Sequence, residues 1–259
     1  MATRILIVGS SGFIGSQLCE SLQNDYEIHR NTFNLLKAGG LEELKKYLLL
    51  NRISVVVQLA WNSNGRENYH LSLANYDWRD LTINLSIFCH DNNIKFVGVG
   101  SCLDGKLNRT NPYINSKYET KKHLLSMKST NLIAWVRPFY VVNFEQKRPR
   151  IIGDYFEKKE SFILKNPNEK LDYIFSEDVV TGFKSVIDNQ MMGEIDIGSG
   201  FLTSNLDFIN RLNEIHGKSD FRMEGVDREY KAGEVASPFL RQFGWIPHVT
   251  ERFFGIQCI

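Results

Sequence analysis

A tyrosine and a lysine four residues apart, Tyr113 and Lys117, form the pattern in this sequence best suited to proton transfer. Residues four apart share one face of a helix, so the two side chains are neighbours if this segment is helical. A nearby positive charge lowers the pKa of a phenol and makes it usable as an acid or base near neutral pH. Because the spacing also arises by chance on protein surfaces, the interpretation depends on where the pair lies in the fold.

A serine suited to binding a reacting oxygen, Ser101, precedes Tyr113 by 12 residues. It directly follows the run 95–100, which is predicted to be a strand, and ligands bind at the carboxyl ends of parallel strands. Its hydroxyl would hydrogen-bond a substrate carbonyl or hydroxyl group. The position favours Ser101, Tyr113 and Lys117 as catalytic residues. The alternative is a turn serine and an unrelated surface pair.

Three glycines at a spacing of three, Gly9, Gly12 and Gly15, lie between an apolar strand-like run and a segment with helical spacing. Glycine lets the backbone approach a pyrophosphate closely, and the start of the following helix offers free N–H groups and a positive dipole end. In this context the pattern predicts dinucleotide binding, the alternative being a tight turn without a ligand. The expected contacts are Gly9, Ser11, Gly12, Phe13, Ile14 and Gly15.

The end of the second predicted strand, residues 26–30, bears on the type of dinucleotide. A site for NAD(H) places an acidic residue about 20 positions after the glycine loop begins, where it binds the ribose 2′-hydroxyl. This chain has Arg30 and Asn31 there, with no acid. An arginine pairs with a 2′-phosphate, so the sequence favours NADP(H) over NAD(H). The alternative is a solvated arginine at a strand end.

Strand-like and helical segments alternate over the first part of the chain, which predicts an α/β fold with a parallel sheet covered on both faces. Beyond about residue 140 the alternation weakens. We therefore expect a Rossmann-type dinucleotide-binding domain over 1–140 and a small α/β substrate lobe over 141–259, with part of the second segment returning to the first domain. The expected strands include 4–8, 26–30, 53–60, 95–100, 132–137, 171–175 and 194–198, and the expected helices include 16–22, 41–50, 76–92, 113–127, 177–188 and 205–216.

Composition excludes several other classes of protein. With 259 residues, 42% of them hydrophobic, the chain can bury a large core. The net charge of +1 and the lack of a basic block argue against a nucleic-acid-binding protein. No apolar run suits a membrane span and no secretion signal is evident, so we expect a cytoplasmic protein with reduced cysteines. Scattered histidines and cysteines predict no metal site.

Together these residues resemble the extended short-chain dehydrogenase/reductase family, which contains NAD-dependent epimerases, dehydratases and ketoreductases of nucleotide sugars. The resemblance spans nearly the whole chain. It is carried by the glycine loop, Leu59-Ala60 after a strand, Ser101, Tyr113 with Lys117, Arg137-Pro138-Phe139, Asp172-Tyr173-Ile174 with Glu177-Asp178-Val179, and Ile197-Gly198-Ser199-Gly200.

The resemblance implies a role for each of these positions. Tyr113 would exchange a proton with a sugar oxygen, Ser101 would orient that oxygen, and Lys117 would hold the nicotinamide ribose. Leu59, Ala60 and Pro138 would also contact the cofactor. The C-terminal lobe would bind a nucleotide sugar, and two copies of the chain would form a homodimer.

Departures from the family pattern narrow the expected reaction. Cys102-Leu103 stand where dehydratases carry an Asp-Glu pair, so dehydration is not expected. Val141-Val142-Asn143 replace the usual Tyr-Gly-Pro-like turn, and the connection from Ser101 to Tyr113 is about half the usual length. The runs 59–61 and 100–102 are similar to the subgroup that reduces CDP-4-keto-deoxysugars to paratose or abequose.

The sequence therefore leads to one main hypothesis, an NAD(P)H-dependent reductase of a nucleotide-activated 4-keto-6-deoxyhexose. An epimerase that retains NAD and a non-catalytic NADP(H)-binding sensor remain alternatives. Substrate contacts are expected from residues after a strand end and from two arginines that would meet the diphosphate. These residues are Trp61, Asn62, Ser63, Arg148 and Arg150.

Overall fold

The computed structural model describes residues 3–62, 69–105, 107–108, 110–127, 132–144, 151–157, 162–217, 221–225 and 234–255. The chain divides into two compact units. The first, here the sheet unit, consists of residues 1–138 and 180–195, and the second, here the lobe, consists of residues 139–179 and 196–259. Each unit therefore contains two separate stretches of the chain.

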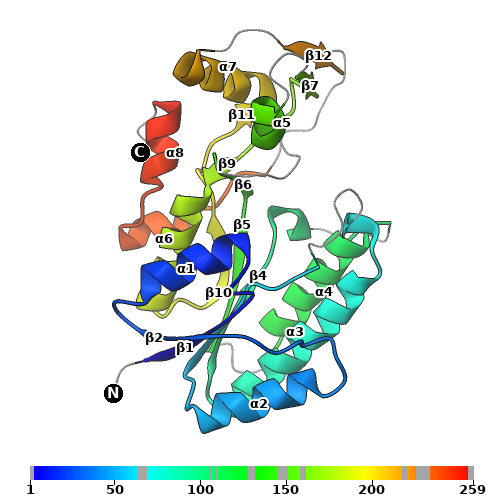
Figure 1. Ribbon diagram of the computed structural model, residues 1–259, viewed down its shortest axis with the longest axis vertical. Coiled ribbons are helices and arrows are strands. Elements are labelled where there is room, and N and C mark those ends of the chain that lie inside the picture. The colour runs from blue at the N-terminus through cyan, green and yellow to red at the C-terminus, as the bar shows by residue number, and fades with distance from the viewer. Residues whose placement is uncertain are drawn as a thin grey trace. The chain divides into compact units, whose positions relative to one another are not determined.

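The sheet unit contains a six-stranded sheet with strand order β10-β5-β4-β3-β1-β2 (Figure 1). The pairings β1–β2, β1–β3, β3–β4 and β4–β5 are all parallel. The predicted α/β fold with a parallel, Rossmann-like sheet is thus confirmed. Its elements are β1 (Arg4–Val8), α1 (Phe13–Leu22), β2 (Glu27–Arg30), α2 (Gly40–Leu50), β3 (Val55–Gln58), η1 (Tyr69–Leu71), α3 (Ala74–Asp91), β4 (Lys95–Val99), η2 (Cys102–Gly105), α4 (Pro112–Leu125), β5 (Ile133–Pro138), α6 (Ser176–Asp188) and β10 (Gly193–Ile197).

Helices cover both faces of this sheet, which explains why its central strands are apolar on both sides. All four residues of β3 are buried, as are four of the five in β1. On one face, side chains of α2, α3 and α4 such as Leu44, Leu85 and Leu124 form one core with Leu6 and Phe96 of the sheet. Helices α1 and α6 lie on the other face (Figure 1).

The lobe is built from short elements around an aromatic core. Phe175, Phe208 and Phe253 are buried together in it, with the rings of Tyr173 and Phe208 stacked at 4.4 Å between centroids. Its strands pair as β6–β9, β8–β11 and β7–β12. Its elements are β6 (Tyr140–Val142), α5 (Ile151–Glu157), β7 (Ile163–Lys165), β8 (Lys170–Leu171), β9 (Tyr173–Phe175), β11 (Thr203–Ser204), α7 (Asn205–His216), β12 (Arg222–Glu224), η4 (Pro238–Phe243) and α8 (His248–Phe254).

One expected strand of the lobe, 171–175, is wrong as a continuous element. The chain forms β8 and β9 on either side of Asp172, whose carboxylate is buried. It accepts hydrogen bonds from the N–H groups of Ser199 (2.7 Å), Gly200 (3.0 Å) and Ala236 (2.9 Å). The strand is interrupted because this residue serves as a buried acceptor for two loops.

A second buried aspartate holds the beginning of α8. The carboxylate of Asp178 accepts from the N–H groups of Val249 (3.1 Å) and Thr250 (2.7 Å) and from the Thr250 hydroxyl (2.6 Å). These N–H groups lie in the first turn of the helix, where they have no partner within the helix. Asp178 therefore caps α8 from a distant part of the chain.

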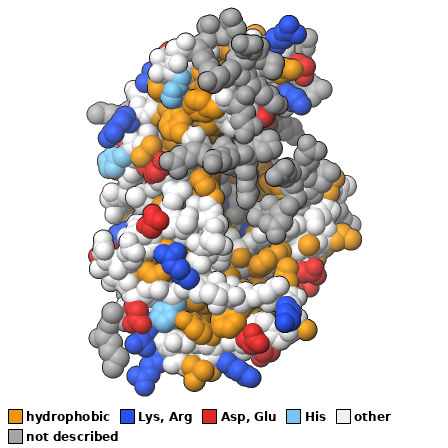
Figure 2. All heavy atoms as spheres, in the orientation of Figure 1, with side chains coloured by type: hydrophobic (Ala, Val, Ile, Leu, Met, Phe, Trp, Pro, Cys, Tyr) orange, Lys and Arg blue, Asp and Glu red, His pale blue; other side chains and the backbone are white. Residues whose placement is uncertain are grey.

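On the face shown in Figure 2, Lys and Arg side chains are scattered among acidic and apolar ones. Within the described residues, no helix is both long enough and apolar enough to cross a lipid bilayer. The same residues contain no group of three or more His, Cys, Asp or Glu side chains placed to hold a metal ion.

Candidate functional site

The glycine loop joins β1 to α1 and has little room for side chains. Gly9 has a φ of +86°, and a Cβ there would lie 2.7 Å from the backbone nitrogen of Ala60. A Cβ at Gly15 would overlap the carbonyl oxygen of Gly9, whereas one at Gly12 would lie 3.1 Å from that oxygen. The loop is therefore folded back tightly on itself and on the end of β3.

The beginning of α1 leaves backbone donors available for an anion. Gly12 is the N-cap residue, and no side chain caps the helix. Ser11, Gly12 and Phe13 are exposed, and Ile14 is partly buried. The first N–H groups of a helix lack partners within the helix and carry the positive dipole end, so this loop fits a pyrophosphate.

The side chain of Arg30 starts from the strand beside this loop. In the sheet register Arg30 pairs with Ile7, two residues before Gly9, and its side chain is exposed. Asn31 follows, and its amide is occupied by a local turn with the backbone of Phe33 at 3.1 and 3.2 Å. Arg30 is thus an exposed cation on the strand beside the glycine loop, while the Asn31 side chain shapes the turn.

Two further predicted cofactor contacts lie against the end of β1. The N–H groups of Leu59 and Ala60 both donate to the carbonyl oxygen of Val8, at 2.9 and 3.1 Å. Pro138, another predicted cofactor contact, is the last residue of β5 and is partly buried. These strands are parallel members of one sheet, so Leu59, Ala60 and Pro138 lie at its carboxyl edge, as the glycine loop does.

The structure brings Ser101 and Tyr113 into contact. Asn111 caps α4 by accepting from the N–H of Ile114 at 3.1 Å, and Pro112 is the first helical residue, which places Tyr113 in the first turn. Ser101 follows β4 and lies close enough to the Tyr113 phenol to lower its pKa. Ser101 is 8% exposed. The two side chains therefore lie close together despite the short connection between them.

The environment of Tyr113 acts on its phenol in opposing directions. Burial raises the pKa of Tyr113 above its ordinary value, and the nearby Tyr69 raises it further, whereas the hydrogen bond with Ser101 lowers it. Burial also lowers the pKa of Lys117 well below its usual range, which favours the uncharged amine. The expectation of a lowered phenol pKa is therefore wrong for this structure, because burial outweighs the lowering effect of Ser101.

Lys117 is enclosed by backbone and aromatic rings. It is 1% exposed, and its Nζ donates to the carbonyl oxygen of Val99 at 2.7 Å. The ring of Trp61 lies over this Nζ, 3.5 Å from nitrogen to ring centroid. The Tyr113 ring centroid is 6.0 Å from the same nitrogen. Lys117 and Tyr113 thus share one aromatic environment at the start of α4.

Trp61 is held in place by a residue that the sequence did not single out. Its indole Nε1 donates to Oδ1 of Asn75 at 3.0 Å, and Asn75 is fully buried. The Asn75 amide donates in turn to the backbone oxygens of Tyr69 (2.7 Å) and Ser72 (2.8 Å). A lone asparagine near a helix start gives no sequence signal for such a role.

Trp61, a predicted substrate contact, lies over the Lys117 amine, and Asn62 follows it, partly buried. The other predicted substrate contacts, Ser63, Arg148 and Arg150, lie outside the described residues.

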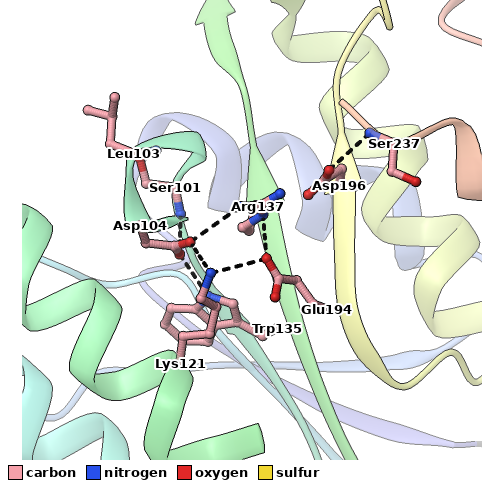
Figure 3. Close-up of polar contacts among 9 residues, drawn as sticks. All are labelled: Ser101, Leu103, Asp104, Lys121, Trp135, Arg137, Glu194, Asp196 and Ser237. Carbon is pink, nitrogen blue, oxygen red and sulfur yellow. Dashed lines mark hydrogen bonds and ion pairs between the residues drawn. The ribbon is translucent and has the colours of Figure 1, made fainter. Parts of the chain in front are cut away.

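A buried carboxylate beneath the serine was also missed by the sequence analysis. Asp104 is fully buried and contacts Ser101, Lys121, Trp135 and Arg137 (Figure 3). An acid three residues after a serine has no distinctive spacing, so its contacts were not foreseeable from the chain alone.

Comparison with known proteins identifies the family of the chain. The sequence model of the NAD dependent epimerase/dehydratase family matches residues 5–198, well over half of the chain. No curated protein sequence matches this chain significantly.

Solved structures share the fold at low sequence identity. The dTDP-4-dehydrorhamnose reductase of Bacillus anthracis str. Ames, in complex with NADP, has a TM-score of 0.77 at 15% identity, covering 98% of this chain and 99% of that chain. The UDP-glucose 4-epimerase of Thermus thermophilus, in complex with NAD, has a TM-score of 0.74 at 18% identity, covering 95% and 94%. The dTDP-glucose 4,6-dehydratase of Bacillus anthracis str. Ames, in complex with NAD, has a TM-score of 0.74 at 17% identity, covering 95% and 92%.

Proposed function

Because the chain belongs to the NAD dependent epimerase/dehydratase family, we propose that it is an NADPH-dependent reductase of a nucleotide-activated 4-keto-6-deoxyhexose. The observation that carries the proposal is the close placement of Ser101, Tyr113 and Lys117 in the unit that also holds the glycine loop. This arrangement supplies a proton donor and an orienting hydroxyl for a carbonyl oxygen.

The groups around Ser101 favour reduction over dehydration. Dehydration needs a base and an acid beside the hydroxyl residue, and here Cys102 and Leu103 occupy those positions. The nearest described acid, Asp104, is fully buried and paired with Lys121 at 2.9 Å. It is therefore not available to remove a proton from a substrate.

The cofactor site fits a dinucleotide with a 2′-phosphate. The uncapped start of α1 would hold the pyrophosphate, and the exposed guanidinium of Arg30 would pair with the phosphate on the ribose. NADP in the complex of the dTDP-4-dehydrorhamnose reductase is consistent with this choice. Bound NADPH supplies the hydride that adds to the keto carbon.

Residues of this chain would supply the proton that completes the reduction. Tyr113 donates its phenolic proton to the oxygen of the carbonyl group, which becomes a hydroxyl. Ser101 hydrogen-bonds the same oxygen and holds it in line with the phenol. Its hydroxyl oxygen already accepts from the N–H of Leu103 at 3.2 Å, so its own hydrogen can be donated. Lys117 lies beside the phenol and would hold the cofactor ribose, and Trp61 and Asn62 would contact the substrate.

The test is the oxidation of NADPH, and separately of NADH, in the presence of CDP-, dTDP- and GDP-linked 4-keto-6-deoxyhexoses. We expect stoichiometric loss of reduced-nicotinamide absorbance with one nucleotide series and a preference for NADPH. Tyr113→Phe should lower kcat by a factor of about 100 or more, the range for a lost general acid. Tyr118→Phe, which changes the other tyrosine of the same helix region, is the matched control and should keep its activity.

Other outcomes would replace the proposal. Full turnover by Tyr113→Phe would remove the assigned proton donor. Interconversion of sugar isomers with tightly retained NAD and no net oxidation would identify an epimerase. Binding of NADPH without any turnover would identify a sensor.

Arg30→Ala tests the cofactor assignment separately. We expect NADPH to bind at least tenfold more weakly, about 1.4 kcal/mol, with little change for NADH. Equal losses for both cofactors would show that Arg30 does not recognise the 2′-phosphate.

We also expect a homodimer formed through α3 and α4. The apolar stripe of α3 is split in the structure: Leu81 and Leu85 are buried in the core, whereas Trp78 and Phe88 are only partly buried. Sedimentation velocity tests this expectation, and a monomer at micromolar concentration would contradict it.

A further inference from the structure

The carboxylate of Asp104 lies under the serine loop, which we define as Gly100–Gly105, and the proposed reaction does not use it. One oxygen, Oδ2, accepts from the backbone N–H of Ser101 at 3.1 Å and from the indole Nε1 of Trp135 at 2.8 Å. The other, Oδ1, lies 2.9 Å from Lys121 Nζ and 3.7 Å from Arg137 Nη1 (Figure 3). A fully buried carboxylate is stable only with partners of this kind.

Charge is balanced around this carboxylate. Glu194 pairs with the same two cations, at 3.1 Å from Lys121 and 2.9 Å from Arg137 (Figure 3). The four charged groups come from η2, α4, β5 and β10. The network therefore ties the serine loop to three other elements of the sheet unit, and it presents no net charge that would attract a ligand of its own.

The backbone beside the carboxylate is shaped to admit it. A Cβ at Gly100 would lie 2.7 Å from Asp104 Oδ2 and 2.5 Å from Trp135 Nε1. Any larger residue at this position would push the carboxylate or the indole away. The glycine before Ser101 is thus required by the contact and not by the turn.

The contact fixes the direction of the serine side chain. Asp104 holds the N–H of Ser101, and the N–H of Leu103 donates to the Ser101 hydroxyl oxygen at 3.2 Å. With its oxygen accepting from inside the loop, the hydroxyl can donate its own hydrogen away from the loop. Tyr113 lies on that side, because Ser101 is near enough to lower the pKa of its phenol.

We propose that Asp104 is the positioning residue for Ser101: its buried, ion-paired carboxylate fixes the serine loop so that the Ser101 hydroxyl faces Tyr113 and the substrate oxygen. Asp104 acts through Ser101 and touches no reacting atom. The inference rests on the proposed function for its catalytic part, and the structural part stands separately. The ion-paired acid anchors a connection in which Tyr113 follows Ser101 by only 12 residues.

The first experiment measures the loop without any substrate. Cys102 lies in the serine loop and is 8% exposed, whereas Cys19 and Cys89 are fully buried in other elements. Alkylation by iodoacetamide, followed by peptide mass spectrometry, reports each thiol separately. Asp104→Asn should raise the alkylation rate of Cys102 at least tenfold and leave Cys19 and Cys89 unchanged.

The matched control is another buried aspartate that holds a backbone N–H. Asp196 is 6% exposed and accepts from the N–H of Ser237 at 2.9 Å (Figure 3). Asp196→Asn should leave Cys102 protected. If Asp104→Asn does not fold, Lys121→Gln removes the nearest cation and leaves the carboxylate in place. It should raise Cys102 alkylation in the same direction by a smaller factor.

The second experiment is a double-mutant cycle on kcat with the substrate that gives turnover. Asp104→Asn should lower kcat about tenfold or more and leave the Kd for NADPH unchanged. If Asp104 acts through Ser101, adding Asp104→Asn to Ser101→Ala should change kcat by less than about twofold, because effects through a shared partner are not additive.

Each result decides a separate statement. Equal increases in alkylation of all three cysteines, or no increase at Cys102, would overturn the positioning role. If the losses in kcat of Asp104→Asn and Ser101→Ala multiply in the double mutant, Asp104 does not act through Ser101. Absence of turnover with every keto-sugar would contradict the proposed function, and the alkylation result would still decide what holds the serine loop.

Discussion

Trp61 covers the amine of Lys117, so a ligand that reaches this nitrogen has to displace the indole. The Nζ lies 3.5 Å from the ring centroid, and the lysine is 1% exposed. The indole is also hydrogen-bonded to Asn75 at 3.0 Å. If Lys117 holds the nicotinamide ribose, NADPH binding must break both contacts of Trp61.

The size of the effect follows from these two contacts. A desolvated contact between a protonated amine and a ring contributes at most about 2 kcal/mol here, because burial lowers the pKa of Lys117, and a neutral hydrogen bond contributes about 1 kcal/mol. Trp61→Ala removes both before NADPH binds, so the cofactor should bind up to about 100-fold more tightly, at about 1.4 kcal/mol per tenfold. Trp61→Phe keeps a ring over Lys117 and loses only the hydrogen bond, so the gain should be about fivefold.

Isothermal titration of NADPH into the three proteins measures this series. Urea unfolding measures the same two contacts, because their loss should lower the free energy of unfolding of Trp61→Ala by up to about 3 kcal/mol. An unchanged or weaker affinity of Trp61→Ala for NADPH would refute the reasoning. It would mean that the indole stays in place on binding or contacts the cofactor itself.

Three further changes test other parts of the structure. Gly15→Ala should weaken NADPH binding in a titration more than tenfold, because its Cβ would overlap the Gly9 carbonyl oxygen. Gly12→Ala should weaken binding less, because its Cβ would lie 3.1 Å from that oxygen. Equal losses of affinity would contradict this loop geometry. Asp172→Ala should lower the free energy of unfolding in urea by about 3 kcal/mol or more, since it leaves buried N–H donors without an acceptor; a loss under about 1 kcal/mol would show that the lobe tolerates it. Burial lowers the pKa of Lys95 from 10.5 to about 8, so between these values the unfolded chain holds more protons than the folded protein and stability rises with pH. Lys95→Met should therefore be more stable than the parent protein by about 2 kcal/mol in urea at pH 7, and the difference should shrink toward pH 10. A difference that does not change with pH would contradict this explanation.

The sheet unit was largely predictable because its signals are local. Apolar runs mark β1 and β3, and the glycines between β1 and α1 mark the loop that joins them. The lobe was not predictable in this way, because its strands are two or three residues long and depend on contacts with distant segments. The missed helices α5 and α8 are seven residues each, too short for a clear helical period.

The residues of the candidate site also fall into those that local sequence signals predict and those that depend on distant contacts. Tyr113 and Lys117 are neighbours through helical spacing alone, and Ser101 follows a strand that the sequence marks clearly. Asn75 and Asp104 were missed because their partners lie 14 and 31 residues away, at Trp61 and Trp135. No local pattern distinguishes a buried acceptor of this kind from a solvated one.

The interleaving of the two units has a consequence for how this protein is made. The edge strand β10 begins at residue 193, after the first stretch of the lobe, so the sheet cannot be completed until most of the chain has left the ribosome. The lobe is completed later still, because the N–H groups that donate to Asp178 belong to residues 249 and 250. Such late, long-range closures slow folding and leave apolar strand edges exposed meanwhile. A nascent chain that stops before α8 should therefore depend on chaperones, and neither unit can be expressed as one continuous fragment.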